Sequence, residues 1–454
     1  MPSSPHRPQS DAEAIRINNQ IDEDLKREHE QLKRRRPKEI KVMLLGQAES
    51  GKSTLQKQFQ LYYSSQTLDH ERPAWRPIVY FNILRAIRMI LAELDYEYFS
   101  AQGTTAPTVA PSLSSSSGDS QSGPSTGYSS VDPAWIAELS QLRSKLLPLV
   151  ASEDALASEL SGGVTVTGGR TGVYVRAGWQ ALTTASRSWP LSDIRGTNGA
   201  KAPVMTDIVA KTLAANQDEI EDLWHHPGVR VLLATNKLRL EEYAAFFLDS
   251  IHRIAQPDYL PSTDDILHVR LQTLGVKEHV FDINMAGSNY TWLLYDVGGA
   301  RGQRQAWVPY FEDATAVIFL APISAFDQYL EEDARTNRID DSLQLFTSIC
   351  TNKLLQKAAL VLMLNKTDLL KQKLAAGIKV RRYISSYGDR PNTYEEVSEY
   401  FRAHFMQVHR RKDVHRRPLY VHFTSMLDIK ATQRIIVNVN EAIMKRHMAT
   451  IGLA

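Results

Sequence analysis

A glycine-rich segment, Gly46-Gln47-Ala48-Glu49-Ser50-Gly51-Lys52-Ser53-Thr54, constrains this chain more than any other part of its sequence. It follows a short apolar run at 40–45 and precedes a stretch that favours a helix. Between a buried strand and a helix, the pattern G-x-x-x-x-G-K-[ST] predicts a phosphate-binding P-loop. Backbone N–H groups and the helix N-terminus would bind phosphate oxygens, Lys52 would reach the terminal phosphates, and the Ser53 hydroxyl would ligate Mg²⁺.

Further apolar runs, bounded by turn residues, predict the other strands of a sheet at 291–295, 316–320, 359–364 and 419–423. Helical stretches separate these runs. Strands that alternate with helices form parallel α/β sheets, which bind their ligands at the carboxyl ends of the strands.

A base-recognition motif, Asn365-Lys366-Thr367-Asp368, directly follows the predicted strand at 359–364. The Asp368 carboxylate can accept hydrogen bonds from N1–H and N2–H₂ of guanine, which adenine cannot offer, while Asn365 and Lys366 would brace the base and the P-loop. A site built around such hydrogen bonds discriminates strongly against bases that lack them. The motif predicts GTP or GDP and argues against an ATP-dependent P-loop kinase.

A second phosphate-side motif, Asp296-Val297-Gly298-Gly299, follows the predicted strand at 291–295. The Asp296 carboxylate would hold Mg²⁺ through water, and Gly299 leaves room for a backbone N–H to meet the γ-phosphate. A contact that exists only with GTP makes this segment a switch element. The competing interpretation is an ordinary turn after a strand.

The strand–helix alternation is lost between 67 and 262, where the remaining segments are mostly helical, for example 79–94, 135–147 and 240–254. This pattern predicts an all-helical insertion. Within it, the Ser-, Thr-, Gly- and Pro-rich stretch at 101–130 predicts a disordered loop, and a similar stretch at 161–202 predicts a flexible one.

The N-terminal stretch at 9–36 combines dense alternating charge with apolar residues at helical spacing, and predicts one long exposed helix that ends at Pro37. The net charge of +2, from 53 basic and 51 acidic residues, gives no indication of nucleic-acid binding. Basic clusters at 33–41 and 409–417 are either solvated faces or contacts with anionic lipid.

The sequence contains no apolar run near the ~18 residues that would span a bilayer and no signal-peptide core, so neither secretion nor a transmembrane segment is expected. Cys350 is the single cysteine and cannot form an internal disulfide. It favours a reducing, cytoplasmic compartment and a buried thiol.

The motifs and their surroundings resemble the alpha subunits of heterotrimeric G proteins, in a divergent, fungal-type form. Asp265-Ile266-Leu267-His268-Val269-Arg270-Leu271-Gln272-Thr273-Leu274-Gly275 is similar to the family's first switch. The stretches at 257–261, 307–316 and 342–350 are similar to the exit from the helical domain, the segment after the second switch and the next helix. The similarity covers residues 8–100 and 220–454.

This resemblance implies a Ras-like GTPase domain at 38–66 and 263–454, an inserted helical domain at 67–262, and a helix at 1–37 that binds a beta-gamma dimer. It implies a GTP/GDP switch with Mg²⁺ that transduces signals from a seven-helix membrane receptor to a downstream effector and is controlled by a regulator. The expected location is the cytoplasmic face of the plasma membrane, as a peripheral protein.

The resemblance also assigns roles to residues. Arg270 takes the position of the arginine finger that neutralises charge on the transferring phosphoryl group, and a glutamine after the second-switch glycines would orient the attacking water. The expected metal ligands are Ser53, Thr273 and, through water, Asp296. The expected GTP-binding residues are Gly46, Glu49, Ser50, Gly51, Lys52, Ser53, Thr54, Gly299, Asn365, Lys366, Asp368 and Met426.

Several positions depart from the family. Ala300 replaces the water-orienting glutamine, and Ala48 replaces a P-loop glycine, so intrinsic GTP hydrolysis is expected to be impaired. Gln303 and Gln305 are the nearby candidates to replace the missing glutamine. Met426 stands where the guanine-side loop of the family has alanine.

At the termini, Pro2 replaces the glycine that N-myristoylation requires, Ser3 replaces a cysteine that many members carry in palmitoylated form, and Ile451 replaces a cysteine found in some members. Two interpretations remain open. One is a GTP-hydrolysing signalling switch, and the other is a hydrolysis-deficient, GTP-loaded scaffold or effector-binding protein.

Overall fold

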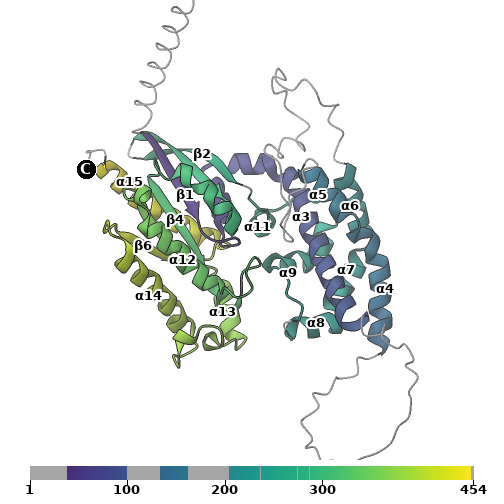
Figure 1. Cartoon of the computed structure of the whole chain (residues 1–454). Helices are drawn as coiled ribbons and strands as arrows, with labels where there is room; N and C mark the ends of the chain where they lie inside the picture. The colour runs from purple at the N-terminus through teal and green to yellow at the C-terminus, as the bar shows by residue number, and fades with distance from the viewer. Residues whose placement is uncertain are drawn as a thin grey trace, which may run out of the picture. The chain divides into compact units, whose positions relative to one another are not determined.

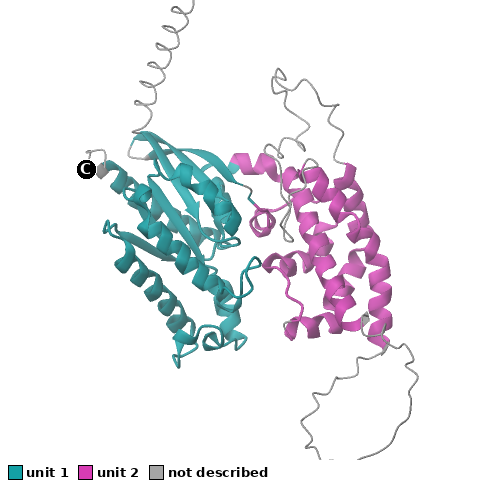
Figure 2. Ribbon diagram, in the orientation of Figure 1, with its two compact units in different colours: residues 1–65, 273–454 teal, residues 66–272 magenta. Residues whose placement is uncertain are grey.

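The computed structural model describes residues 38–99, 133–161, 204–235, 237–273, 275–285 and 287–450. The chain divides into two compact units, one formed by residues 1–65 and 273–454 and the other by residues 66–272 (Figure 2). The expected helix at 1–37 and the expected loop at 101–130 lie outside the described residues, as does all of the expected loop at 161–202 except Ser161.

The first unit is built on a six-stranded sheet with the strand order β2-β3-β1-β4-β5-β6 (Figure 1). Its strands are β1 (Glu39–Leu45), β2 (Val276–Met285), β3 (Ser288–Val297), β4 (Ala316–Pro322), β5 (Ala359–Asn365) and β6 (Leu419–Phe423). Every residue of β4 and β5 is buried, as expected for central strands covered on both faces. The strands predicted from apolar runs are all present.

Strand β2 was not predicted, and it gives the expected parallel sheet one antiparallel edge. β2 runs antiparallel to β3, with Val276 opposite Val297 and Met285 opposite Ser288. Its side chains alternate: Val280 is exposed, whereas Phe281 is buried. An antiparallel edge strand can keep one face in solvent, so its sequence lacks the continuous apolar run that identified the central strands.

Helices cover both faces of this sheet (Figure 1). They are α2 (Lys52–Tyr63), α12 (Arg338–Thr351), α13 (Thr367–Ala375), α14 (Tyr394–Lys412) and α15 (Ile429–Thr450), with the 3₁₀ helices η5 (Arg301–Tyr310), η6 (Ile323–Asp327), η7 (Lys353–Leu355), η8 (Val380–Arg382) and η9 (Ser385–Tyr387). One apolar core joins Phe319 to Phe346 and Phe405 of α12 and α14. The other joins Trp292 to helices α2 and α15.

The second unit is helical over its described residues. Its helices are α3 (Ser65–Leu94), α4 (Pro133–Val150), α5 (Glu153–Ser161), α6 (Val204–Ala215), α7 (Gln217–His225), α8 (Pro227–Ala234), α9 (Glu242–Leu248), α10 (Ile251–Ile254) and α11 (Thr263–His268), with a π-helical segment, η2 (Asp95–Phe99). None of the helices in the described part of the chain is long and apolar enough to cross a membrane.

Two helix predictions in this unit need correction. The helix predicted at 79–94 begins much earlier, at Ser65, and continues through Pro73 and Pro77. The single helix predicted at 240–254 is two helices, α9 and α10, because the chain turns at Asp249 and Ser250. The Asp249 side chain accepts a 2.5 Å hydrogen bond from the indole of Trp224, which ties this turn to α7.

Candidate functional site

The predicted P-loop turns the chain from the end of β1 into α2, and two of its glycines are required by its geometry. Gly46 and Gly51 have φ of 145° and 100°, a region that favours glycine. A β-carbon at Gly46 would lie 2.4 Å from the Leu320 carbonyl oxygen, and one at Gly51 would lie 2.3 Å from Asn365 Nδ2. The loop therefore needs both glycines to approach the neighbouring strand ends.

Lys52 crosses the inside of this loop. Its Nζ donates to the carbonyl oxygens of Gly46 at 2.9 Å and Gln47 at 2.5 Å. Burial lowers the pKa of Lys52 to about 8, although the charge of Asp296 opposes the shift. The carbonyl contacts fix the position of the ammonium group at the centre of the loop, where a phosphate would supply the missing negative charge.

The three expected metal ligands come from separate segments and meet in one cluster. Ser53 and Thr273 both donate to Asp296 Oδ2, at 2.7 and 2.9 Å, and their hydroxyl oxygens are 3.0 Å apart. Asp296 is buried, and its Oδ1 has no hydrogen-bond partner among the described residues. Two hydroxyl oxygens beside a carboxylate oxygen that lacks a hydrogen-bond partner fit a Mg²⁺ site, because Mg²⁺ prefers oxygen ligands and keeps several bound water molecules.

The predicted base-recognition residues lie where β5 leads into α13. Asn365 Nδ2 donates to the Ser50 carbonyl at 2.8 Å, and Asn365 Oδ1 accepts from Thr424 Oγ1 at 3.0 Å. Lys366 adopts a left-handed conformation with φ 66°, and Asp368 lies half-exposed in the first turn of α13. Asn365 thus ties the P-loop to the ends of two strands.

The side chain of Met426 packs away into the apolar core that contains Ile436 instead of projecting freely from the loop after β6. Its carbonyl accepts from Gln58 Nε2 at 2.8 Å. The backbone of this loop is therefore anchored to α2.

The second-switch motif lies directly against the P-loop. A β-carbon at Gly299 would lie 2.3 Å from the carbonyl carbon of Gln47 and 2.4 Å from the backbone nitrogen of Ala48. The adjacent Gly298 accepts a 2.9 Å hydrogen bond from the indole of Trp307, which is buried. Ala300 follows as the residue that precedes η5.

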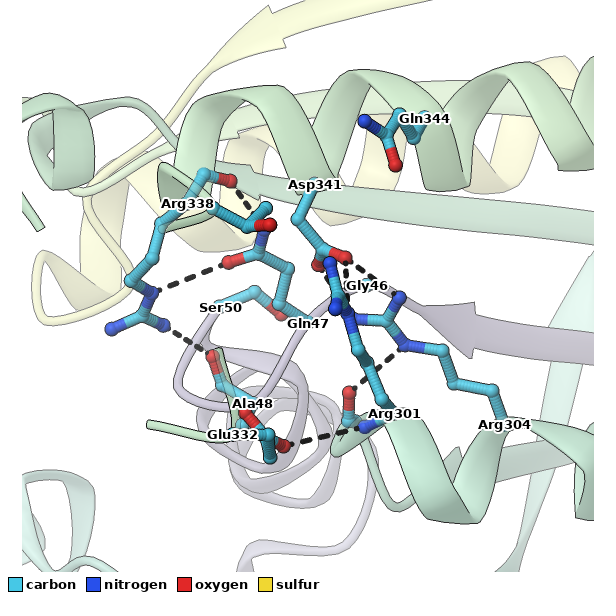
Figure 3. A network of polar contacts seen from close by, with 12 residues as sticks. Gly46, Gln47, Ala48, Ser50, Arg301, Arg304, Glu332, Arg338, Asp341 and Gln344 are labelled. Carbon is cyan, nitrogen blue, oxygen red and sulfur yellow. Dashed lines mark hydrogen bonds and ion pairs between the residues drawn. The ribbon is translucent and has the colours of Figure 1, made fainter. Parts of the chain in front are cut away.

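Arg338, which was not predicted as a site residue, clamps the P-loop from the start of α12 (Figure 3). Its guanidinium donates to Gln47 Oε1 at 3.3 Å, to the Ala48 carbonyl at 2.5 Å and to Glu49 Oε2 at 2.8 Å. Gln47 Nε2 returns a hydrogen bond to the Arg338 carbonyl. Glu49, predicted as a GTP-binding residue, directs its side chain to this arginine.

A second polar cluster holds η5 against α12 (Figure 3). Arg304 makes a two-pronged contact with Asp341, with distances of 2.6 and 3.0 Å, and Arg301 Nε lies 3.2 Å from the same carboxylate. Burial alone would raise the pKa of Asp341, but Arg304 and Arg301 outweigh it and hold that pKa below its ordinary value. The carboxylate stays charged and fixes the second-switch segment.

A family model for the G-protein alpha subunit matches residues 15–443. The chain belongs to the G-protein alpha subunit family. It is 31% identical over 488 residues to the guanine nucleotide-binding protein alpha-4 subunit of Mycosarcoma maydis, an alignment that covers 91% of this chain and 83% of that protein. The fold class expected from the sequence is confirmed: a Ras-like GTPase domain combined with a helical domain.

Arg270 of this G-protein alpha subunit lies in the second unit, because residues 263–272 cluster with the helices. Within that unit its guanidinium pairs with Glu241. Its backbone N–H donates to Asn82 Oδ1 at 2.8 Å, and its carbonyl accepts from Asn82 Nδ2 at 3.1 Å. The backbone of Arg270 is therefore fixed on α3, and its role as an arginine finger stays a prediction.

Proposed function

We propose that this G-protein alpha subunit is a GTP/GDP switch that requires Mg²⁺ and transduces signals from a seven-helix membrane receptor. The observation that carries the proposal is the convergence of Ser53, Thr273 and Asp296 within 3.0 Å of one another. One Mg²⁺ ion can contact the hydroxyl of the P-loop, the hydroxyl of the first switch and the carboxylate of the second switch only if these three segments lie together. Their arrangement supports control of both switches by the nucleotide.

In this proposal Ser53 and Thr273 bind Mg²⁺ directly and Asp296 binds it through water, while Lys52 faces the terminal phosphates. When bound, the ion neutralises charge on the phosphates. The P-loop backbone from Gly46 to Thr54 and the Gly299 N–H bind phosphate oxygens, and Asn365, Lys366, Asp368 and the backbone of Met426 recognise guanine. The hydrogen bonds of Asn365 with Ser50 and Thr424 fix its side chain beside the P-loop, which supports this assignment.

GTP hydrolysis in this protein is proposed to be slow. The methyl group of Ala300 cannot hydrogen-bond to water, and Ala48 adds a β-carbon to the P-loop beside Gly299. Arg270 would still supply positive charge to the transferring phosphoryl group. The second candidate function, a GTP-loaded scaffold that binds effectors, follows from the same two alanines if the remaining rate is negligible.

The proposed partners are a beta-gamma dimer that binds residues 1–37, a receptor, an effector and a regulator. A groove of about 610 Å³ between η5 and α12, lined in part by Trp307, Val308, Phe311 and Leu345, supports an effector contact at the switch. The proposed location is the cytoplasmic face of the plasma membrane. The basic cluster at 33–41 would support attachment there through anionic lipid.

A single-turnover assay with γ-labelled GTP tests the switch directly. The purified chain should bind GTP with a Mg²⁺-dependent affinity and release phosphate slowly, and faster when an accelerating regulator is added. Tight binding with no phosphate release under either condition would establish the scaffold instead. Failure to bind guanine nucleotides at all would refute both candidates.

A further inference from the structure

Gln303 lies one turn after Ala300, the position at which the family's glutamine is missing. Ala300 precedes the 3₁₀ helix η5, and the Gln303 N–H donates to its carbonyl at 3.0 Å. Ala300 itself is extended, with φ −61° and ψ 147°, and Gln303 lies in the first turn of the helix that follows it. The Gln303 carboxamide therefore starts one turn after the position that lost its glutamine.

The Gln303 side chain turns back toward Gly298 and the backbone of Thr273. Its Oε1 lies 1.6 Å from the point that a β-carbon on Gly298 would occupy, and the Thr273 carbonyl oxygen lies 2.7 Å from the same point. The hydroxyl of Thr273 belongs to the cluster with Ser53 and Asp296. Gly298 thus provides the space through which the carboxamide reaches the first switch.

The oxygen of this carboxamide is buried and accepts no hydrogen bond from any residue that the structure describes. A buried acceptor without a donor is costly, and such groups commonly bind water or a ligand. Gln305, the other nearby glutamine, is exposed. Only Gln303 combines an orientation toward Thr273 with an unsatisfied oxygen.

We propose that Gln303 orients the attacking water during GTP hydrolysis, in the role that residue 300 has lost. This inference rests on the proposed GTPase function. The Gln303 Oε1 and the Thr273 carbonyl each accept a hydrogen bond from one water molecule. The water oxygen bonds to the γ-phosphorus while the bond from that phosphorus to the bridging oxygen breaks, which yields GDP and inorganic phosphate. The water's protons leave on the phosphate and to solvent, and Gln303 itself is neither protonated nor deprotonated.

The test compares Gln303→Ala with Gln305→Ala in the full-length chain. Single-turnover GTP hydrolysis should fall by about 100-fold for Gln303→Ala, as expected for loss of a group that acts on the transition state, and by less than about twofold for Gln305→Ala. The affinity for a non-hydrolysable GTP analogue should stay unchanged in both. Adding Ala300→Gln to Gln303→Ala should restore hydrolysis.

A second readout does not depend on turnover. GDP with fluoroaluminate mimics the transferring phosphoryl group, and its binding can be followed by tryptophan emission because Trp307 contacts Gly298. Gln303→Ala should weaken this complex about as much as it slows hydrolysis. Unchanged hydrolysis and fluoroaluminate binding in Gln303→Ala would overturn the inference and leave the GTPase function standing. An equal loss of affinity for the non-hydrolysable analogue would assign Gln303 a structural role instead. An unmodified chain that binds GTP without hydrolysing it would refute both the inference and the GTPase activity.

Discussion

The α-carbon of Gly299 packs so closely on the backbone of Gln47 that a β-carbon there would lie 2.3 Å from the Gln47 carbonyl carbon. No side chain tolerates that separation, and the neighbouring atoms are backbone that cannot rotate aside. The second switch and the P-loop can therefore meet in this arrangement only while residue 299 is glycine.

Gly299→Ala should separate the second switch from the P-loop at a cost of about 1–3 kcal/mol to the closed arrangement. We expect GTP to change the tryptophan emission and protease resistance of the unmodified chain but not of Gly299→Ala, while GDP affinity stays similar. Gly302→Ala is the matched control, since beyond the adjoining residues and the backbone of its own helix nothing lies within 4 Å of a β-carbon built there. A normal GTP response in Gly299→Ala would contradict the prediction.

Asp368→Asn should weaken GDP binding roughly 100-fold and favour xanthine nucleotides, because the amide can no longer accept from both N1–H and N2–H₂ of guanine. Competition of GDP and XDP against a fluorescent nucleotide measures the change. Asp389→Asn serves as control, because that carboxylate is 96% exposed and pairs with the surface residue Arg381. Equal GDP affinity in Asp368→Asn and the control would remove Asp368 from base recognition.

Arg338→Ala should speed GDP release by roughly 30-fold, equivalent to about 2 kcal/mol, since it removes the hydrogen bond to the Ala48 carbonyl and the ion pair with Glu49. Arg338→Lys should recover only part of the loss, because an ammonium cannot reproduce the planar fork. Stopped-flow release of a fluorescent GDP measures both. Arg402→Ala removes an exposed arginine paired with Glu399 and should leave the rate unchanged. Similar release rates in Arg338→Ala and Arg402→Ala would mean that the clamp does not control the nucleotide.

Cys350 is the only cysteine of the chain, and burial raises the pKa of its thiol to about 12. An unfolded cysteine has a pKa of about 8.5, so above that pH the unfolded state loses a proton that the native state keeps. The contribution of this thiol to the free energy of unfolding therefore falls as the pH rises above about 8.5. At pH 8 iodoacetamide should label the native protein at least about 1000-fold more slowly than the urea-unfolded chain, as measured by mass spectrometry. Rapid stoichiometric labelling of the native chain would show that the thiol is accessible.

The parts of the site that follow from local sequence were predictable, because each depends on a few adjacent residues. The P-loop and the motif that contains Asp368 are of this kind, as are the fully buried strands β4 and β5. The partners and positions of the Arg338 and Gln303 side chains could not be predicted, because they depend on how α12 and η5 pack against segments that are distant in the sequence. Strand β2 was missed for a different reason, since an edge strand with one solvated face has no continuous apolar run.

The clamp formed by Arg338 also bears on how the protein is made. Its contacts with Gln47, Ala48 and Glu49 each join residues 289–291 positions apart. Contacts of such separation form late, because the entropy of closing a long loop must be overcome before they contribute. During translation, residues 46–54 leave the ribosome long before residue 338 has been synthesised. A nascent chain therefore carries the whole P-loop sequence without the arginine that fixes it, and we expect it to retain nucleotide only once most of its length has been synthesised.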